Sequence, residues 1–163
     1  MLLFHYTHIK TAIDKINKDQ KLIVSKTDRD HGLKPAVWFS SDNNFEVTAL
    51  KGFINNDNGE YTRFKTFEEQ LDKIGWVRFV IDDKDGLLIG WKDYVHVSGL
   101  SEREWKKMEE THIKLGANPS KWFCSFEDIH YENLLRAEVF TNKWVEMNND
   151  NLKIAIENAD WLK

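Results

Sequence analysis

The sequence predicts an α+β fold, built as one domain over residues 1–163. Short apolar runs typical of strands alternate with amphipathic helical patterns, but the helices are too scattered for regular βαβ units. With 41% hydrophobic and 13% aromatic residues, the chain has enough apolar mass for one core. The low content of 2 prolines and 8 glycines excludes a linker or a low-complexity chain.

Five apolar or aromatic runs are predicted as strands, because such residues suit a pleated, half-buried surface. They cover residues 2–6, 22–24, 36–40, 76–81 and 134–140. The run at 76–81 is the clearest central strand. Residues 87–97 fit either a further strand pair or an irregular segment.

Helices are predicted where apolar spacing of three and four follows a capping residue. The expected N-caps are Thr7, Asp42, Thr66, Ser101 and Asp150, with capping boxes at Thr66–Glu69 and Ser101–Glu104. Gly116 ends the helix that Ser101 begins. The polar stretches at 25–35, which includes His31, at 55–60 and at 117–131 are expected to be loops.

Charge and composition exclude several classes of protein. The 27 acidic and 23 basic residues give a net charge of -4, which is unlike a charge-driven duplex-binding protein. A single cysteine, Cys124, excludes an internal disulfide and is expected to be a buried small hydrophobe. The six histidines are scattered, so no metal site is expected. No apolar run approaches the roughly 20 residues of a membrane span, and no signal peptide is visible, so a cytoplasmic location is expected.

Three short segments carry the chemistry, since no P-loop, Rossmann glycine or hydrolase motif occurs. The first, Phe4-His5-Tyr6-Thr7, offers an imidazole, a hydroxyl and free backbone groups at a strand end. The second, residues 36–40, places Trp38 and Ser40 on one face of a strand, as a stacking surface beside a hydroxyl. The third, residues 134–140, places the Glu138 carboxylate in an apolar strand, where a charge is costly unless paired.

These segments resemble the ADP-ribosyltransferase superfamily of the His–aromatic–Glu type, which includes poly(ADP-ribose) polymerases, diphtheria-toxin-like and DarT-like enzymes. Leu3-Phe4-His5-Tyr6-Thr7 is similar to the first-strand motif of the superfamily, and residues 37–40 to its middle aromatic segment. Thr48-Ala49 is similar to the Ser-Ala of its next helix, and Glu138 stands where the catalytic glutamate falls. The matches cover about twenty residues, in the superfamily's order.

The resemblance implies split, twisted antiparallel sheets around a cleft that binds NAD as substrate. It implies that His5 and Thr7 bind the ribose, that Tyr6 lends its backbone to the carboxamide, and that Trp38 stacks near the nicotinamide beside Ser40. Glu138 would stabilise the oxocarbenium-like ribose while ADP-ribose passes to a protein or nucleic-acid acceptor.

The sequence also departs from the superfamily. Tyr6 replaces a glycine, Trp38 replaces a tyrosine, and Arg136 stands where an arginine-specific transferase needs a carboxylate or amide. The first of these favours an alternative, a module that binds NAD or ADP-ribose without turnover. A further alternative is a protein-interaction module of a phage or mobile element, suggested by the 7 tryptophans.

Four of the site residues also have a purely structural explanation. His5 suits a satisfied strand-end histidine, Trp38 the core, Ser40 a turn cap, and Glu138 an ion pair with Arg136 or Arg78. The aromatic residues Trp122, Phe123 and Phe126 suit either an acceptor site or a satellite hydrophobic cluster.

Overall fold

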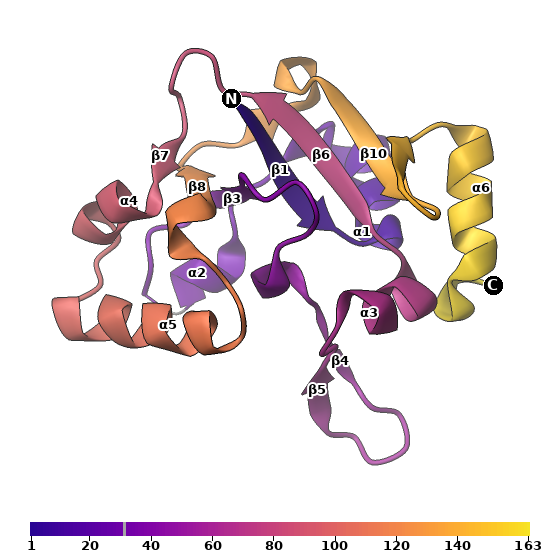
Figure 1. Ribbon diagram of the computed structural model, residues 1–163, viewed down its shortest axis with the longest axis horizontal. Helices are drawn as coiled ribbons and strands as arrows, with labels where there is room; N and C mark the ends of the chain where they lie inside the picture. Colours follow the sequence, from indigo (N-terminus) through magenta and orange to yellow (C-terminus); the bar gives the residue numbers. More distant parts are fainter. Residues whose placement is uncertain (31) are drawn as a thin grey trace.

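The computed structural model describes residues 1–30 and 32–163 and shows an α+β fold around a seven-stranded sheet (Figure 1). Every strand pairing of the described residues is antiparallel. In spatial order, the sheet consists of β11 (Trp144–Glu146), β10 (Arg136–Phe140), β6 (Val77–Asp82), β1 (Leu2–Thr7), β3 (Val37–Ser40), β8 (Trp122–Ser125) and β7 (Ile89–Gly90). Two small pairs stand apart from it, β2 (Lys21–Leu22) with β9 (Ile129–His130) and β4 (Gly52–Ile54) with β5 (Tyr61–Arg63).

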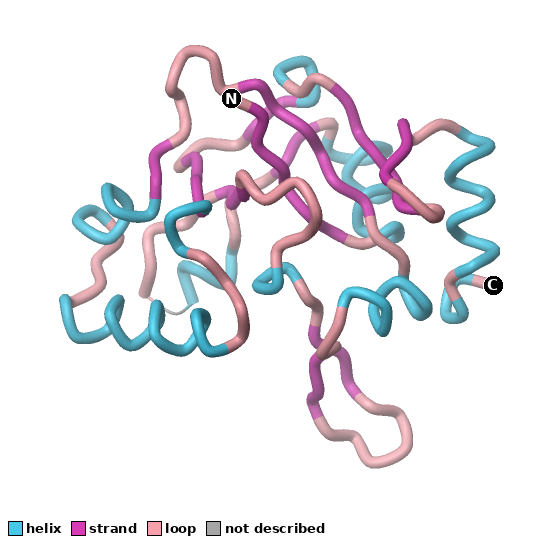
Figure 2. Tube along the Cα trace, in the orientation of Figure 1, coloured by secondary structure: helices cyan, strands magenta, loops and turns pink. Residues whose placement is uncertain are grey.

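Helices cover the sheet and its two ends (Figure 2). They are α1 (Ile9–Asp14), α2 (Lys26–Asp30), α3 (Phe67–Ile74), α4 (Trp91–Val97), α5 (Glu102–Lys114) and α6 (Asn149–Asn158). A π-helical turn at Lys15–Asp19 continues α1, and 3₁₀ turns occupy Val47–Ala49, Pro119–Lys121, Tyr131–Asn133 and Asp160–Leu162. Helix α6 lies beside β10, α4 and α5 lie at the β7–β8 end, and the β4–β5 hairpin projects away from the body (Figure 1).

The two faces of the sheet bury different cores. On one face, Leu3, Phe79 and Val139 pack with residues of α1 and α6. On the other face, Phe4 and Tyr6 belong to an aromatic cluster with residues of α3, and a second cluster joins β3 and β8 to α4. Successive residues of a strand point to opposite faces, so β1 contributes to both cores by alternation.

The sheet divides between β1 and β3. Strand β1 pairs with β6 at six successive positions, from Leu2 to Thr7. With β3 it shares a single register pair, Phe4 with Ser40. Beyond that pair a side chain replaces the backbone ladder, because Nδ1 of His5 lies 2.8 Å from the Trp38 carbonyl oxygen. The two strands therefore separate toward Thr7, which leaves space between their edges.

The strands predicted at 2–6, 36–40, 76–81 and 134–140 are confirmed, although each end shifts by up to two residues. Thr66 and Ser101 are confirmed as the N-caps of α3 and α5. At Ser101 and Glu104 both hydrogen bonds of the capping box are present. Helix α1 begins after His8 instead of Thr7, and α6 after Asn148 instead of Asp150. Gly116 ends α5 with a positive φ of 93°, as the C-terminal glycine signal predicts.

Three loop and helix predictions were wrong. Residues 122–125, expected in a loop, form β8 in the central sheet, where β8 pairs with β3 and buries Trp122 and Cys124. The segment lacks a clear alternation of polar and apolar residues, so its sequence does not indicate a strand. The helix expected after Asp42 is only a 3₁₀ turn, since the Glu46 carboxylate binds the Thr48 amide and the chain then turns into β4. The loop at 25–35 contains α2; His31 lies outside the described residues. The segment at 87–97, which fitted either a strand pair or an irregular segment, forms β7 and α4.

Candidate functional site

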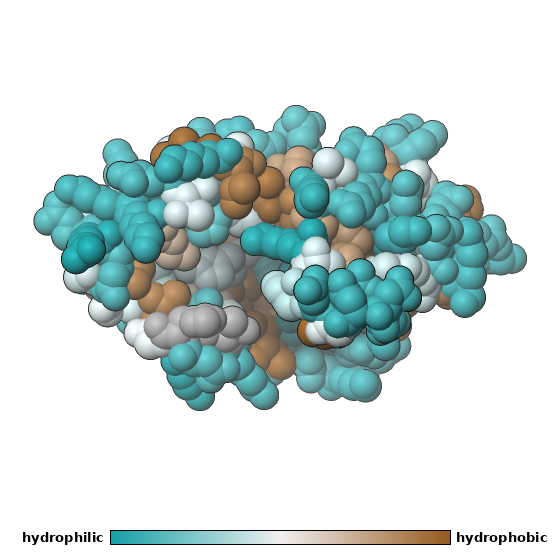
Figure 3. All heavy atoms as spheres, turned by 90° about the horizontal axis from the view of Figure 1, so that it is seen from below, coloured by the Kyte–Doolittle hydropathy of each residue, from teal (hydrophilic) through white to brown (hydrophobic). Residues whose placement is uncertain are grey.

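A cavity of about 600 Å³ lies where β1 and β3 separate. Its walls include all five residues predicted from the sequence to bind a nucleotide. These are His5, Tyr6, Thr7, Trp38 and Ser40. Seen from below, the molecule is hollowed near its middle, with apolar side chains inside the hollow and a rim of mixed hydropathy (Figure 3). Two sequence segments about thirty residues apart thus meet at one concave site.

The imidazole of His5 is neutral at physiological pH. Burial lowers its pKa from 6.5 to about 3, against the opposing effect of the hydrogen bond to the Trp38 carbonyl. A carbonyl only accepts, so we assign the proton to Nδ1, which donates across 2.8 Å. This tautomer leaves Nε2 as an acceptor for a ligand hydroxyl.

The indole of Trp38 is fixed by packing and by one hydrogen bond. Its ring centre lies 4.6 Å from that of Tyr94 in an edge-to-face arrangement, and 6.0 Å from that of Trp91. Its Nε1 donates to Oδ2 of Asp28, in α2, across 3.1 Å. Because the side chain is half-buried and lines the cavity, Trp38 serves the core and also presents a rigid aromatic surface.

Ser40 belongs to a buried network around Glu46. Its hydroxyl donates to Oε2 of Glu46 across 3.0 Å. The other carboxylate oxygen accepts from the amide and the hydroxyl of Thr48, across 3.2 and 3.1 Å. Glu46 is 8% exposed and also lines the cavity, so its carboxylate is held in one orientation there. The polar run after β3 gives no sequence signal that distinguishes Glu46 from a surface residue.

Tyr6 and Thr7 lie on opposite faces of β1. The phenol of Tyr6 donates to the Asp42 carbonyl oxygen across 2.5 Å, and its ring meets Trp76 edge-on at 6.4 Å. Thr7 is 2% exposed and closes the end of the strand. Because the side chain of Tyr6 is buried, its backbone groups are better placed than its phenol to contact a ligand.

Glu138 lies apart from this cavity, since none of the described residues that line it belongs to β10. Its carboxylate is bound by the guanidinium groups of Arg78, at 2.5 Å, and Arg136, at 2.6 Å. Burial raises the pKa of the Glu138 carboxyl, but hydrogen bonds from Arg136 and Arg78 outweigh it, so the net pKa is lowered. The ion-pair alternative therefore describes the observed contacts, and a catalytic role for Glu138 stays a prediction.

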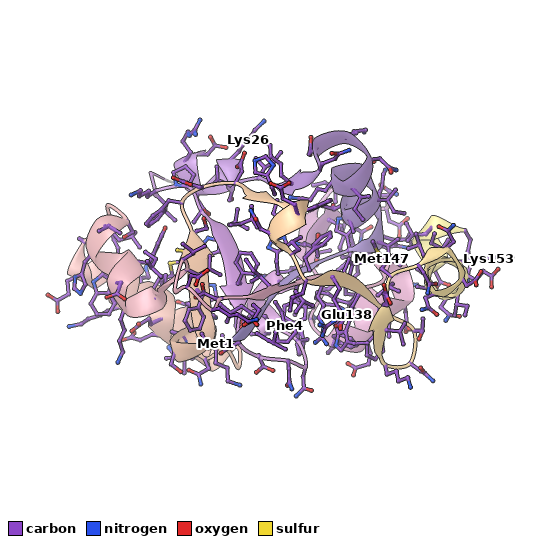
Figure 4. All side chains as sticks on the ribbon, turned by 90° about the horizontal axis from the view of Figure 1, so that it is seen from above. Met1, Phe4, Lys26, Glu138, Met147 and Lys153 are labelled. Carbon is purple, nitrogen blue, oxygen red and sulfur yellow. The ribbon has the colours of Figure 1, made fainter. Side chains whose placement is uncertain are left out.

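The strand order explains this separation, because β6 and β1 lie between β10 and β3. Across the sheet, Tyr6 pairs with Arg78 and Arg78 with Glu138, so these three side chains share one face. His5 directly precedes Tyr6 in the strand, so its side chain points to the other face, where it packs against Phe79. In Figure 4, Glu138 lies near Phe4, while Lys26 of α2 lies on the opposite side of the molecule.

Two further cavity residues, Lys15 and Lys51, carry charges that the sequence does not single out. Lys15 begins the π-helical turn after α1, and Lys51 precedes β4. Of the three aromatic residues 122, 123 and 126, Trp122 lines the cavity, whereas Phe123 and Phe126 pack against hydrophobic cores.

Comparisons with protein-family models, with curated proteins and with solved structures found no match. Among the described residues, no helix is long and apolar enough to cross a membrane. Within the same part of the chain, no three histidine, cysteine or acidic side chains are grouped to hold a metal ion.

Proposed function

We propose that this protein binds a dinucleotide of the NAD class in the cavity between β1 and β3. The observation that supports the proposal is the convergence of the five predicted residues, His5, Tyr6, Thr7, Trp38 and Ser40, on one cavity of about 600 Å³. That volume is in the range of pockets that take small-molecule ligands.

The chemistry of the walls fits such a ligand. The neutral His5 offers an acceptor at Nε2 for a ribose hydroxyl, with Thr7 beside it. The fixed Trp38 ring suits stacking against an aromatic base or a pyridine ring. The backbone at Tyr6 suits a carboxamide, which needs one donor and one acceptor.

ADP-ribosyl transfer to a protein or nucleic-acid acceptor is the second candidate function. The observation that favours it is Glu46, a carboxylate inside the cavity whose two oxygens are already oriented by Ser40 and Thr48. A preorganised anion stabilises positive charge that develops on a ribose, and it also accepts a proton from the attacking group. In this form of the proposal, the carboxylate of Glu46 takes the role that the sequence suggested for Glu138.

Binding is tested by calorimetric titration of NAD and ADP-ribose into the wild type, Trp38→Ala and His5→Gln. The exposed His96→Gln variant is the matched control. Loss of the hydroxyl contact at His5 is expected to weaken binding roughly 3- to 10-fold, and removal of the Trp38 ring by more. A folded wild type that shows no saturable binding of either compound would overturn the proposal.

Turnover is tested separately, by nicotinamide release and by transfer of label from NAD to a cell lysate. Release that is lost in Glu46→Gln and kept in a folded Glu138→Gln supports the transferase with Glu46. Saturable binding without release selects the non-catalytic module.

A further inference from the structure

Two lysines reach the cavity from separate elements without an ion-pair partner. Lys15 and Lys51 both line the cavity and are both half-buried. Across residues 1–30 and 32–163, no carboxylate oxygen lies within 4.0 Å of either ammonium group. Asp19 and Asp128 influence Lys15 only from farther away, and Asp128 is itself paired with Lys21 at 2.7 Å.

The two charges also act on one another and on their surroundings. Burial lowers the pKa of each lysine, and the charge of Lys15 lowers that of Lys51 further. Both lysines also disfavour the charged form of His5, whose lowered pKa results mainly from burial. The two lysines thus place two ammonium groups in a partly dry region.

Such an arrangement is costly for the empty protein. Burial of an ammonium group without a partner costs free energy, and a second one nearby adds repulsion. Clusters of this kind are typical of sites where a ligand supplies the opposite charge. Two acids, Glu46 and Asp28, also line the cavity, but among the described residues neither carboxylate lies within 4.0 Å of either ammonium group; Glu46 accepts from Ser40 and Thr48, and Asp28 from the Trp38 indole.

We propose that Lys15 and Lys51 form an anion site in the cavity and hold the phosphate groups of its ligand. This inference rests on the proposed dinucleotide function and adds the requirement for a diphosphate. Two cations match the two negative charges of a dinucleotide diphosphate, whereas a neutral nucleoside leaves both unpaired. Thr11, which also lines the cavity, adds a hydroxyl nearby.

The experiment compares Lys15→Gln and Lys51→Gln with Lys10→Gln, an exposed lysine of α1. The ligands are ADP-ribose, inorganic pyrophosphate and adenosine, titrated at two salt concentrations. We expect each cavity variant to bind ADP-ribose and pyrophosphate at least 10-fold more weakly, with a smaller salt dependence, while adenosine binding and the Lys10→Gln variant stay unchanged. Lys51→Arg keeps the charge and is expected to retain most of the affinity.

A second readout separates a binding residue from a structural one. Without ligand, Lys51→Gln should unfold at the same temperature as the wild type or higher, because an unpaired buried charge has been removed. Equal ADP-ribose affinity in the wild type and both cavity variants would overturn the anion site while leaving nucleotide binding intact. Lysine-dependent binding of pyrophosphate without binding of NAD or ADP-ribose would support the anion site and refute the dinucleotide.

Discussion

Replacement of Glu138 by glutamine tests whether this carboxylate holds the fold together or serves chemistry. The side chains of Glu138 and Arg78 are each 9% exposed and lie 2.5 Å apart. Glutamine keeps the shape of glutamate but not its charge. The Arg78 guanidinium would then remain between the rings of Phe4 and Trp144, both 4.4 Å away, without a charged partner in its buried pair, while it still donates to the Asn43 carbonyl.

The expected cost follows from that burial. Removal of one partner from a buried ion pair destabilises a protein by about 3 to 5 kcal/mol, because the other charge stays uncompensated. Arg136 is the matched control, since it contacts the same carboxylate at 2.6 Å but is 40% exposed. Arg136→Gln should therefore cost about 1 kcal/mol or less. The simultaneous replacement of Arg78 by Met and Glu138 by Leu should recover much of the loss.

Urea unfolding, followed by tryptophan fluorescence, measures these differences at pH 7. The pH dependence gives a second check. The folded pKa of Glu138 lies below its ordinary 4.5, so its stabilisation is complete above pH 4.5 and is lost as the pH falls through the folded value. A Glu138→Gln protein that is as stable as the wild type but has lost transfer activity would refute the structural explanation and restore Glu138 as a catalytic residue.

Two further predictions concern His5 and Cys124. The pKa of His5 falls from 6.5 to about 3 on folding, so the unfolded chain binds the extra proton between these values. The imidazole should therefore lower the free energy of unfolding by up to about 1.4 kcal/mol per pH unit as the pH drops from 6.5. His5→Gln should remove this part of the slope of unfolding free energy against pH, measured from pH 4 to 8. An unchanged slope would contradict a neutral imidazole. Cys124 is fully buried and its thiol pKa is raised to about 12, so a disulfide reagent at pH 8 should label it only on unfolding, and rapid labelling of the native protein would contradict the burial.

The parts of the fold that the sequence predicted are those decided locally. The apolar run at 76–81 indicates a central strand by itself, and the structure has β6 at Val77–Asp82. The capping box of Ser101 and Glu104 likewise indicates where a helix begins. Strand β8 depends instead on its partner, because its aromatic residues suit a loop cluster until β3 pairs with them. The helix expected at Phe45–Phe53 was lost to a competing side-chain contact, that of Glu46 with the Thr48 amide.

The candidate site shows the same limit. Its two aromatic and polar segments were predicted because each carries several suitable groups within four residues. Lys15, Glu46 and Lys51 are single charged residues outside any motif, and only their tertiary positions place them in the cavity. The adjacency of β1 and β3, which creates the space, also depends on long-range pairing that no local pattern encodes.

The position of Glu138 shows why an ordered set of residues does not define a site. The order of a histidine, an aromatic residue and a glutamate along the chain does not determine which face of the sheet each side chain occupies, because a shift of one residue reverses the face. In this sheet His5 is aligned with Phe79, and Phe79 with Ala137, so a carboxylate would share the face of the imidazole at position 137. Glu138 is aligned with Tyr6 through Arg78, so it shares the face of Trp38 and Ser40 and not that of His5, and strands β6 and β1 separate it from β3. The carboxylate that does reach the cavity, Glu46, follows β3 at the strand edge, where the alternation of the sheet no longer restricts it.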